Sequence, residues 1–167
     1  MRIMTTNNLR EAFSGESQAY MKYTIFSDVA KKEGLENVAR LFKAIAHAEL
    51  IHARNHLKEL GLIKDSVANL QEAIDGETYE VEEMYPAFHA VAKLQEETGA
   101  QRSTHYALEA EKIHADMYSD AKTIVEQGKD IEIGVIQICE VCGYTAEGDA
   151  PDRCPVCAAP ASKFKAF

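Results

Sequence analysis

Apolar residues recur at spacings of three and four along most of the first 127 positions. That spacing is typical of amphipathic α-helices. It predicts four long helices, over residues 8–33, 35–60, 78–97 and 101–127. The first begins with a capping residue, Asn8, followed three residues later by Glu11. Each stretch is closed by a glycine that suits the left-handed backbone of a helix end. These glycines are Gly34, Gly61, Gly99 and Gly128.

The pattern weakens between the second and third stretches, at residues 63–76, where Ser66, Asn69 and Gly76 interrupt it. We expect a crossover connection there, with a short helix over residues 67–74. Two helix pairs joined by one crossover are typical of a ferritin-like four-helix bundle. Pro86 interrupts the third helix, because proline removes a backbone hydrogen bond and disfavours helix in the residue before it. We expect a kink there, beside Glu83.

The strongest chemical signal is a repeated hexapeptide. Residues 48–53 and 110–115 differ at one position only, and each contains Glu-x-x-His. Residues three apart share a face of a helix, so each segment directs one carboxylate and one imidazole the same way. A single copy would be read as solvated helix surface. Two near-identical copies on apolar stripes indicate two halves of a metal site.

Further carboxylates lie on the apolar stripes of the first and third helices. Glu16 could reach solvent if its helix were rotated, but the stripe makes metal ligation the better interpretation, since a buried unpaired carboxylate is costly. Such oxygen and nitrogen donors suit iron or manganese better than zinc alone. The candidate ligands in the bundle are Glu16, Glu49, His52, Glu80, Glu83, Glu111 and His114.

The C-terminal segment changes character. Residues 129–137 alternate like a β-strand, and two Cys-x-x-Cys pairs follow. Two such pairs closing on one metal predict a tetrahedral site with four thiolates, at Cys139, Cys142, Cys154 and Cys157. The spacing leaves iron and zinc open, and structural zinc is the commoner use of paired knuckles. We therefore expect a bundle at residues 1–128, a linker at 129–137 and a four-cysteine domain at 138–167.

Composition narrows the functional classes. The formal net charge is −9, and no basic run occurs, which argues against a nucleic-acid partner. No segment approaches the length of apolar chain that a membrane span needs, and residues 1–13 contain no apolar stretch of signal-peptide length. We expect a soluble, cytoplasmic protein.

The combined motifs resemble a known family. Cys139-x-x-Cys-Gly-Tyr followed by Cys154-Pro-x-Cys is similar to rubredoxin. Preceded by Gly15-Glu-Ser-Gln-Ala, the doubled Glu-x-x-His and Glu83-Met-Tyr-Pro, it resembles rubrerythrin over nearly the whole chain. The resemblance favours iron over zinc at the cysteines. One departure is Ala158, where the second rubredoxin knuckle usually has glycine. If that backbone is left-handed, alanine adds about 1–2 kcal/mol of strain.

The resemblance implies a non-haem diiron peroxidase that reduces hydrogen peroxide to water. It implies that Glu49 and Glu111 bridge the irons, that Glu16 holds one iron, and that Glu80 and His114 hold the other. One iron would exchange Glu83, when oxidised, for His52, when reduced. Electrons would come through the four-thiolate iron from rubredoxin or an NAD(P)H-dependent reductase.

Two other functions stay open at this stage. The bundle could oxidise and store ferrous iron as a ferritin does, or it could be a scaffold beside a structural zinc ribbon in a regulatory module. The long final helix separates Glu111 from Gly128 by about 25 Å at 1.5 Å per residue. We therefore expect a head-to-tail homodimer in which each C-terminal domain serves the partner's bundle.

Overall fold

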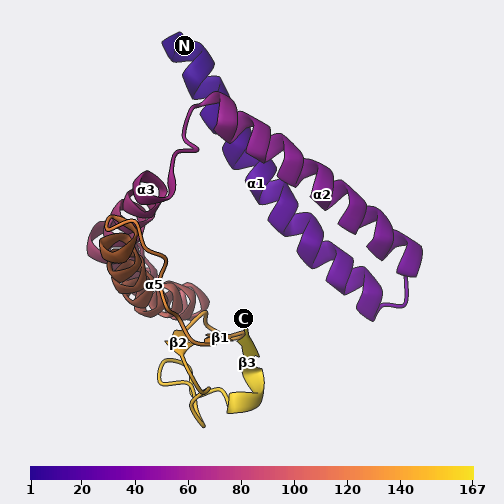
Figure 1. Ribbon diagram of the computed structural model, residues 1–167. Helices are drawn as coiled ribbons and strands as arrows, with labels where there is room; N and C mark the ends of the chain where they lie inside the picture. Colours follow the sequence, from indigo (N-terminus) through magenta and orange to yellow (C-terminus); the bar gives the residue numbers. More distant parts are fainter. The chain divides into compact units, whose positions relative to one another are not determined.

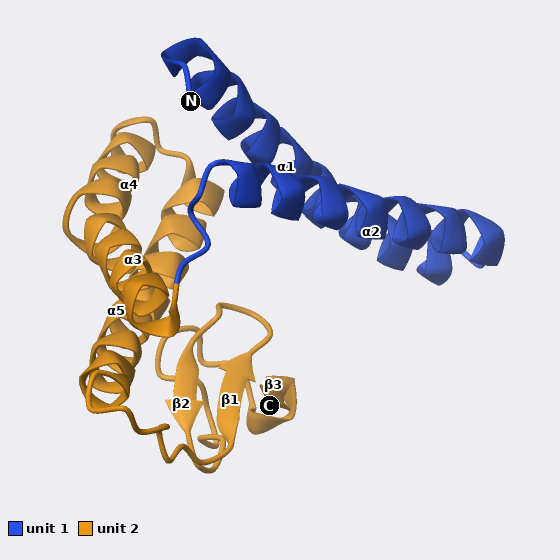
Figure 2. Cartoon of the chain, turned by 45° about the horizontal axis from the view of Figure 1, so that its top comes forward, with its two compact units in different colours: residues 1–64 blue, residues 65–167 orange.

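The first part of the chain is a hairpin of two antiparallel helices. The computed structural model describes residues 1–167, which form two compact units, residues 1–64 and 65–167 (Figure 2). In the first unit α1 (Ile3–Lys32) lies beside α2 (Glu36–Glu59) (Figure 1). The turn between them contains Gly34 at φ +76°, and Gly61 after α2 has φ +70°, as their positions at helix ends predicted.

Small residues allow the two helices of the hairpin to approach closely. Ala39, Ala46 and Ala53 of α2 recur every seven residues and are all buried. The Ser27 hydroxyl on α1 donates a hydrogen bond to the Ala39 carbonyl at 2.8 Å. The predicted start of α1 was wrong, because the helix begins at Ile3 and Asn8 lies in its interior.

The second unit contains the remaining helices: α3 (Ser66–Tyr79), η1 (Glu80–Met84), α4 (Tyr85–Leu94) and α5 (Thr98–Val125). The Asp65 carboxylate caps α3 by accepting a hydrogen bond from the Ala68 backbone N–H at 2.9 Å. The element η1 is a π-helical turn, and it runs directly into α4, which has Pro86 in its first turn. The expected irregularity beside Pro86 is thus a π turn.

Two boundaries in this unit differ from the sequence-based expectation. The short helix expected at 67–74 and the helix expected from residue 78 are one continuous path, because α3 runs through Gly76. The third helix closes at Leu94 rather than at Gly99, which lies inside the first turn of α5. Glu96 supplies the left-handed residue at that helix end, with φ +58°.

A small antiparallel sheet forms the C-terminal part of the second unit. Its strands are β1 (Ile136–Cys139), β2 (Thr145–Glu147) and β3 (Phe164–Ala166), in the order β2-β1-β3. In the register, Ile138 pairs with Thr145 and Cys139 pairs with Phe164. The alternating residues before Ile136 belong to no strand, so the β-structure begins later than expected. None of the helices combines the length and hydropathy that crossing a lipid bilayer requires.

Candidate metal centres

The hairpin carries a first group of potential ligands, which we call group 1: Glu16, Glu49 and His52. One ligand atom from each of the three lies within 4.8 Å of the others. His52 Nδ1 is 3.0 Å from Glu49 Oε2 and 3.7 Å from Glu16 Oε1. Glu49 and His52 are neighbours on α2, whereas Glu16 reaches the group from α1. The antiparallel pairing of the helices therefore assembles what the two sequence segments carry separately.

The second unit carries group 2: Glu77, Glu111 and His114. Their ligand atoms also lie within 4.8 Å of one another, and all three residues are partly buried. His114 Nδ1 is 2.5 Å from Glu111 Oε2 on the same helix. Glu77 comes from the last turn of α3. It was not among the ligands predicted from the sequence.

The π turn explains why Glu77 lies in group 2 and Glu83 does not. In a regular α-helix, Glu80 and Glu83 would share a face. In η1 the Tyr85 N–H bonds to the Glu80 carbonyl, which is the i→i+5 bond of a wider turn. A π turn contains more residues than an α turn, so the three-residue step from Glu80 to Glu83 no longer brings the two side chains to one face. Glu83 is exposed. Glu77 and Glu80 keep close to α-helical spacing, since α3 is regular up to Tyr79.

The electrostatics of group 2 favour a bound cation. Burial raises the pKa of Glu77 to about 7, and the neighbouring Glu111 carboxylate, through its charge and a hydrogen bond, adds to the effect. The pKa of Glu80 is raised by burial and by the charge of Glu111, which places Glu80 near the group. Burial and the charges of Glu80, Glu111 and Glu77 also raise the pKa of the Tyr85 phenol. A metal ion would replace the proton that these crowded carboxylates otherwise retain.

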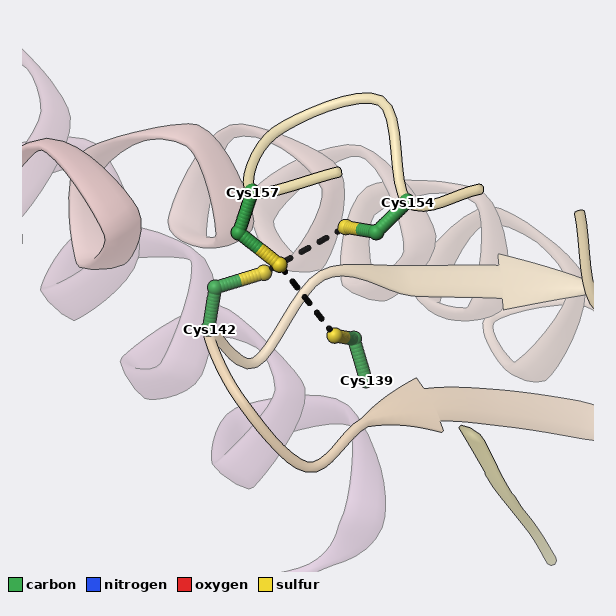
Figure 3. Close-up of side chains that lie close together, drawn as sticks. All are labelled: Cys139, Cys142, Cys154 and Cys157. Carbon is green, nitrogen blue, oxygen red and sulfur yellow. Dashed lines mark hydrogen bonds between the residues drawn. The ribbon is translucent and has the colours of Figure 1, made fainter. Parts of the chain in front are cut away.

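The four cysteines converge as predicted (Figure 3). Cys139 Sγ lies 3.6 Å from Cys157 Sγ, and Cys142 Sγ lies 3.5 Å from Cys154 Sγ. A disulfide would need about 2.05 Å. Four sulfurs held about 2.3 Å from one metal ion at tetrahedral angles are about 3.8 Å apart, so the cluster fits such an ion.

The thiols of this cluster differ in pKa, which is raised for Cys142 and Cys157 and lowered for Cys154. Burial acts to raise the pKa of the Cys154 thiol, but the N–H groups of Cys157 and Val156 outweigh it, so that this pKa is lowered. For Cys142, burial dominates and the pKa is raised. Ala158 follows the second knuckle at φ +59°, which confirms that this position is left-handed and that alanine is strained there.

The four-cysteine knuckle is joined to group 2 of its own chain. His114 Nε2 lies 2.8 Å from the hydroxyl of Thr145, a residue only 4% exposed on β2. We expected each knuckle to serve a partner's bundle. The linker folds back and brings β2 to the chain's own α5, and the head-to-tail homodimer stays a prediction.

Comparisons with known proteins match both parts of the chain. A family model described as Rubrerythrin matches residues 7–122, and one described as Rubrerythrin, rubredoxin-like domain matches residues 137–165. The chain belongs to the rubrerythrin family. Its members include Rubrerythrin-2 of Clostridium acetobutylicum, which is 44% identical over 98% of this chain and 97% of its own length. Nigerythrin of Nitratidesulfovibrio vulgaris is 37% identical over 98% of this chain and 86% of its own length.

Solved structures lead to the same family. A structure described as the partially reduced state of nigerythrin matches with a TM-score of 0.57 and 32% identity, covering 98% of this chain and 86% of that one. The same values hold for nigerythrin in its fully reduced, all-ferrous state. The fold class is therefore the one expected: the helices of a ferritin-like bundle followed by a rubredoxin-like knuckle. Iron is the cofactor of both kinds of site, as the rubrerythrin family and the donor sets indicate.

The residue that sequence reasoning missed had a detectable signal. Glu77 precedes Glu80 by three residues, the same spacing that marks the Glu-x-x-His motifs. Gly76 interrupts the helical pattern directly before Glu77, and only the continuous α3 brings Glu77 and Glu80 to α-helical spacing. The division into residues 1–128, 129–137 and 138–167 stays a prediction.

Proposed function

We propose that this member of the rubrerythrin family is a non-haem diiron peroxidase that reduces hydrogen peroxide to water. The observation that carries the proposal is the presence, in one chain, of two Glu–Glu–His groups and a four-thiolate site whose knuckle contacts a histidine of group 2. Reducing one peroxide to two waters consumes two electrons and two protons. A protein with this task needs a centre that gives two electrons and a route that replaces them.

Bound iron supplies the redox chemistry, because a ferrous pair can give both electrons to the O–O bond. Glu49 and Glu111 are proposed to bridge the pair, Glu16 to hold one iron, and Glu80 with His114 to hold the other. Glu77 is proposed as an additional carboxylate ligand, and ligation by Glu83 stays a prediction. His52 remains the proposed exchangeable ligand.

Tyr85 is a proposed hydrogen-bond donor beside this site. Burial and the charges of Glu80, Glu111 and Glu77 raise the pKa of its phenol, so it stays protonated at neutral pH. A protonated phenol can donate a hydrogen bond to an oxygen atom of the substrate. Glu77, with its raised pKa, is a second group that can carry a proton before metal binds.

The electron donor is proposed to be a rubredoxin or an NAD(P)H-dependent reductase, which reduces the four-thiolate iron one electron at a time. We propose the cytoplasm as the location, since all four thiols are free and a reducing compartment keeps them so. A homodimer also remains a proposal. Large apolar side chains on the hairpin support it, for example Ile25 at 51% and Leu41 at 61% exposure. Light scattering coupled to size exclusion tests this last point.

The function is tested by peroxide consumption in the iron-loaded chain with NADH, a rubredoxin reductase and rubredoxin. We expect one NADH oxidised per peroxide, and a red ferric-thiolate colour that bleaches on reduction. A chain that oxidises ferrous iron with oxygen and retains it, while consuming no peroxide, would instead be an iron-storage protein. A colourless, zinc-loaded knuckle would contradict the electron-transfer part.

A further inference from the structure

We propose that group 2 is a complete site for one divalent metal ion, with Glu77 as one of its three ligands, and that this ion binds before group 1 is filled. The inference deepens the proposed function, because it names a ligand and an order of loading for the same iron pair. Glu77 is the new member, since the resemblance to rubrerythrin pointed to Glu80 and Glu83 on this stretch of chain. All three ligands lie in the second unit, residues 65–167.

The ligand atoms of group 2 are close enough together to surround one ion. One carboxylate oxygen each from Glu77 and Glu111 and a ring nitrogen of His114 lie within 4.8 Å of one another. Two oxygen or nitrogen ligands that are each about 2.1 Å from one ion lie about 3.0–4.2 Å apart, so small side-chain rotations are sufficient. Two carboxylates balance the charge of a divalent ion. A neutral imidazole completes a donor set that suits iron(II) or manganese(II).

The backbone explains why Glu77 reaches this position. The helix α3 is regular up to Tyr79 and packs against α5, which carries Glu111 and His114. Glu77 lies in the last turn of α3 and is partly buried. The π-helical η1 follows directly, and Glu83 within it is exposed. The carboxylate that completes the site therefore comes from the regular helix before the π turn, and no residue of the hairpin is needed.

A comparison with group 1 predicts the order of loading. The glutamates of the two Glu-x-x-His motifs are about equally shielded, but the side chain of His52 is 54% exposed and that of His114 is 29% exposed. Charges attract an ion more strongly where less water screens them. Glu80 is partly buried and close enough to Glu111 to respond to its charge, so a third carboxylate lies near group 2. Group 1 contains two. The first ion is therefore expected at group 2.

The histidine of group 2 is also held in place before a metal arrives. His114 Nε2 lies 2.8 Å from the Thr145 hydroxyl, and Nδ1 faces Glu111. A ring held at its second nitrogen is already oriented for ligation. The contacts of His52 are with carboxylates of its own unit.

The test is a titration of the metal-free, reduced chain with Mn²⁺ alone, in which the free ion is counted by its EPR signal. Mn²⁺ prefers carboxylate and imidazole to thiolate, so the four-cysteine knuckle does not compete for it. Group 1 is removed by Glu16→Ala, Glu49→Ala and His52→Ala together, because alanine suits a helix and loss of a charged cluster is commonly tolerated. Two further chains add Glu77→Gln or, as the matched control, Glu83→Gln to this background.

We expect the chain without group 1 to bind one Mn²⁺ with a Kd within about threefold of the tighter step of the wild-type chain. Adding Glu77→Gln should weaken this step at least about tenfold, because one of three ligands is lost, whereas adding Glu83→Gln should change it less than about twofold. Equal weakening by the two substitutions would overturn the assignment of Glu77. Glu77→Gln in the otherwise unchanged chain keeps the hairpin intact and should also remove the tighter step. If that step persists there, the proposal fails however the first background behaves.

The order of loading has its own variant. Glu77→Ala, Glu111→Ala and His114→Ala together remove group 2 and should leave only a weaker Mn²⁺ site. If this chain kept the tighter step, group 1 would load first and the proposed order would be overturned.

Pulsed EPR of the bound Mn²⁺ identifies the site directly. In the chain without group 1, we expect the coupling of one imidazole nitrogen to Mn²⁺, and adding His114→Ala should remove it. Mn²⁺ bound without nitrogen coupling would be held by surface carboxylates only, which would overturn the proposal.

These measurements separate the proposal from the proposed function, because no peroxide is present in any of them. Iron-loaded wild-type protein that consumes no peroxide would contradict the proposed function and leave the ligand assignment standing. An active wild-type chain whose Glu77→Gln variant binds Mn²⁺ as tightly as before would contradict the ligand assignment alone.

Discussion

Groups 1 and 2 use the same local motif and differ in what holds the histidine. In both, the histidine Nδ1 contacts the glutamate three residues earlier, at 3.0 Å in group 1 and 2.5 Å in group 2. The side chain of His52 is 54% exposed, and its contacts are all with carboxylates of its own unit. The side chain of His114 is 29% exposed, and its second nitrogen is bonded to Thr145. The same motif thus places a histidine beside a glutamate in both groups, and only His114 has a hydrogen-bond partner on its second nitrogen as well.

The groups also differ in their third ligand. Group 1 takes Glu16 from α1, the other helix of the hairpin, whereas group 2 takes Glu77 from the turn just before the π-helical η1. π turns are frequent at functional sites, because they let a helix present a carboxylate that regular spacing would direct elsewhere. Group 2 has the more crowded set of carboxylates. Under the proposed function, His114 would be the fixed ligand and His52 the exchangeable one.

We expect the largest effect from removing the glutamate of both Glu-x-x-His motifs. Glu49→Ala combined with Glu111→Ala should lower peroxide reduction by at least about 10³, because both proposed bridges are lost together. The ferric-thiolate band should survive, since the knuckle has its own ligands. Peroxide turnover and the visible spectrum are measured on the same sample. Persistent peroxidase activity would mean that the two groups are not the catalytic site.

The histidines can be compared directly. His114→Ala should lose iron from the helical part of the chain and reduce turnover about 100-fold, since a held ligand disappears. His52→Ala should retain iron in the oxidised protein and reduce turnover about 10-fold, since its proposed role begins on reduction. Iron analysis and steady-state kinetics distinguish the two. Equal loss of iron in both variants would remove the distinction between the fixed and the exchangeable half.

The π turn can be tested with a pair of conservative substitutions. Glu77→Gln should reduce turnover by about 10- to 100-fold, whereas Glu83→Gln should change it less than about threefold. The reason is that Glu77 lies in group 2 and Glu83 is exposed on η1. If Glu83→Gln were the more damaging change, iron binding would have to draw Glu83 into the site and rearrange η1.

The metal-free chain should show the crowding of group 2 in its pH dependence. The pKa of Glu77 is raised from 4.5 to about 7, so the folded chain holds this proton more tightly than the unfolded chain. The stability that this gives is complete below pH 4.5 and is lost as the pH rises through about 7. Urea unfolding of metal-free protein between pH 4 and about 8 measures it. Glu77→Gln should flatten the slope, and an unchanged slope in that variant would assign the proton to another group.

The smallest expected effect lies in the knuckle. Ala158→Gly should raise the free energy of unfolding of the iron-loaded chain by about 1 kcal/mol, because glycine tolerates the φ of +59° without strain. Ala161→Gly, in the short 3₁₀ helix η2 (Ala161–Lys163), is the control and should be neutral or destabilising. Denaturant unfolding followed by the thiolate band gives both values. Loss of stability in Ala158→Gly would show that the strain at this position is already relieved.

Much of this protein was determined by the sequence alone, wherever the signal is local. The signals that act over only a few residues are the glycines at helix ends, the spacing of Glu-x-x-His and the spacing of the cysteine pairs. In these cases the sequence pattern alone specifies the local structure. They predicted the hairpin, the group 1 ligands, the Glu111–His114 pair and the four-thiolate site. The resemblance to rubredoxin raised a left-handed backbone at position 158 as a condition, and the structure meets it, with Ala158 at φ +59°.

Tertiary structure decided the rest. The π turn in η1 leaves Glu83 exposed and outside group 2, and the residues of that turn do not predict the wider hydrogen bond. Iron ligation by Glu83 stays a prediction. The bond between Thr145 and His114 joins residues that no periodicity relates, and it exists because the linker returns the sheet to α5. A local motif fixes the direction of a side chain on its own helix. Its hydrogen-bond partner from another element depends on packing between distant segments, which a short-range pattern does not encode.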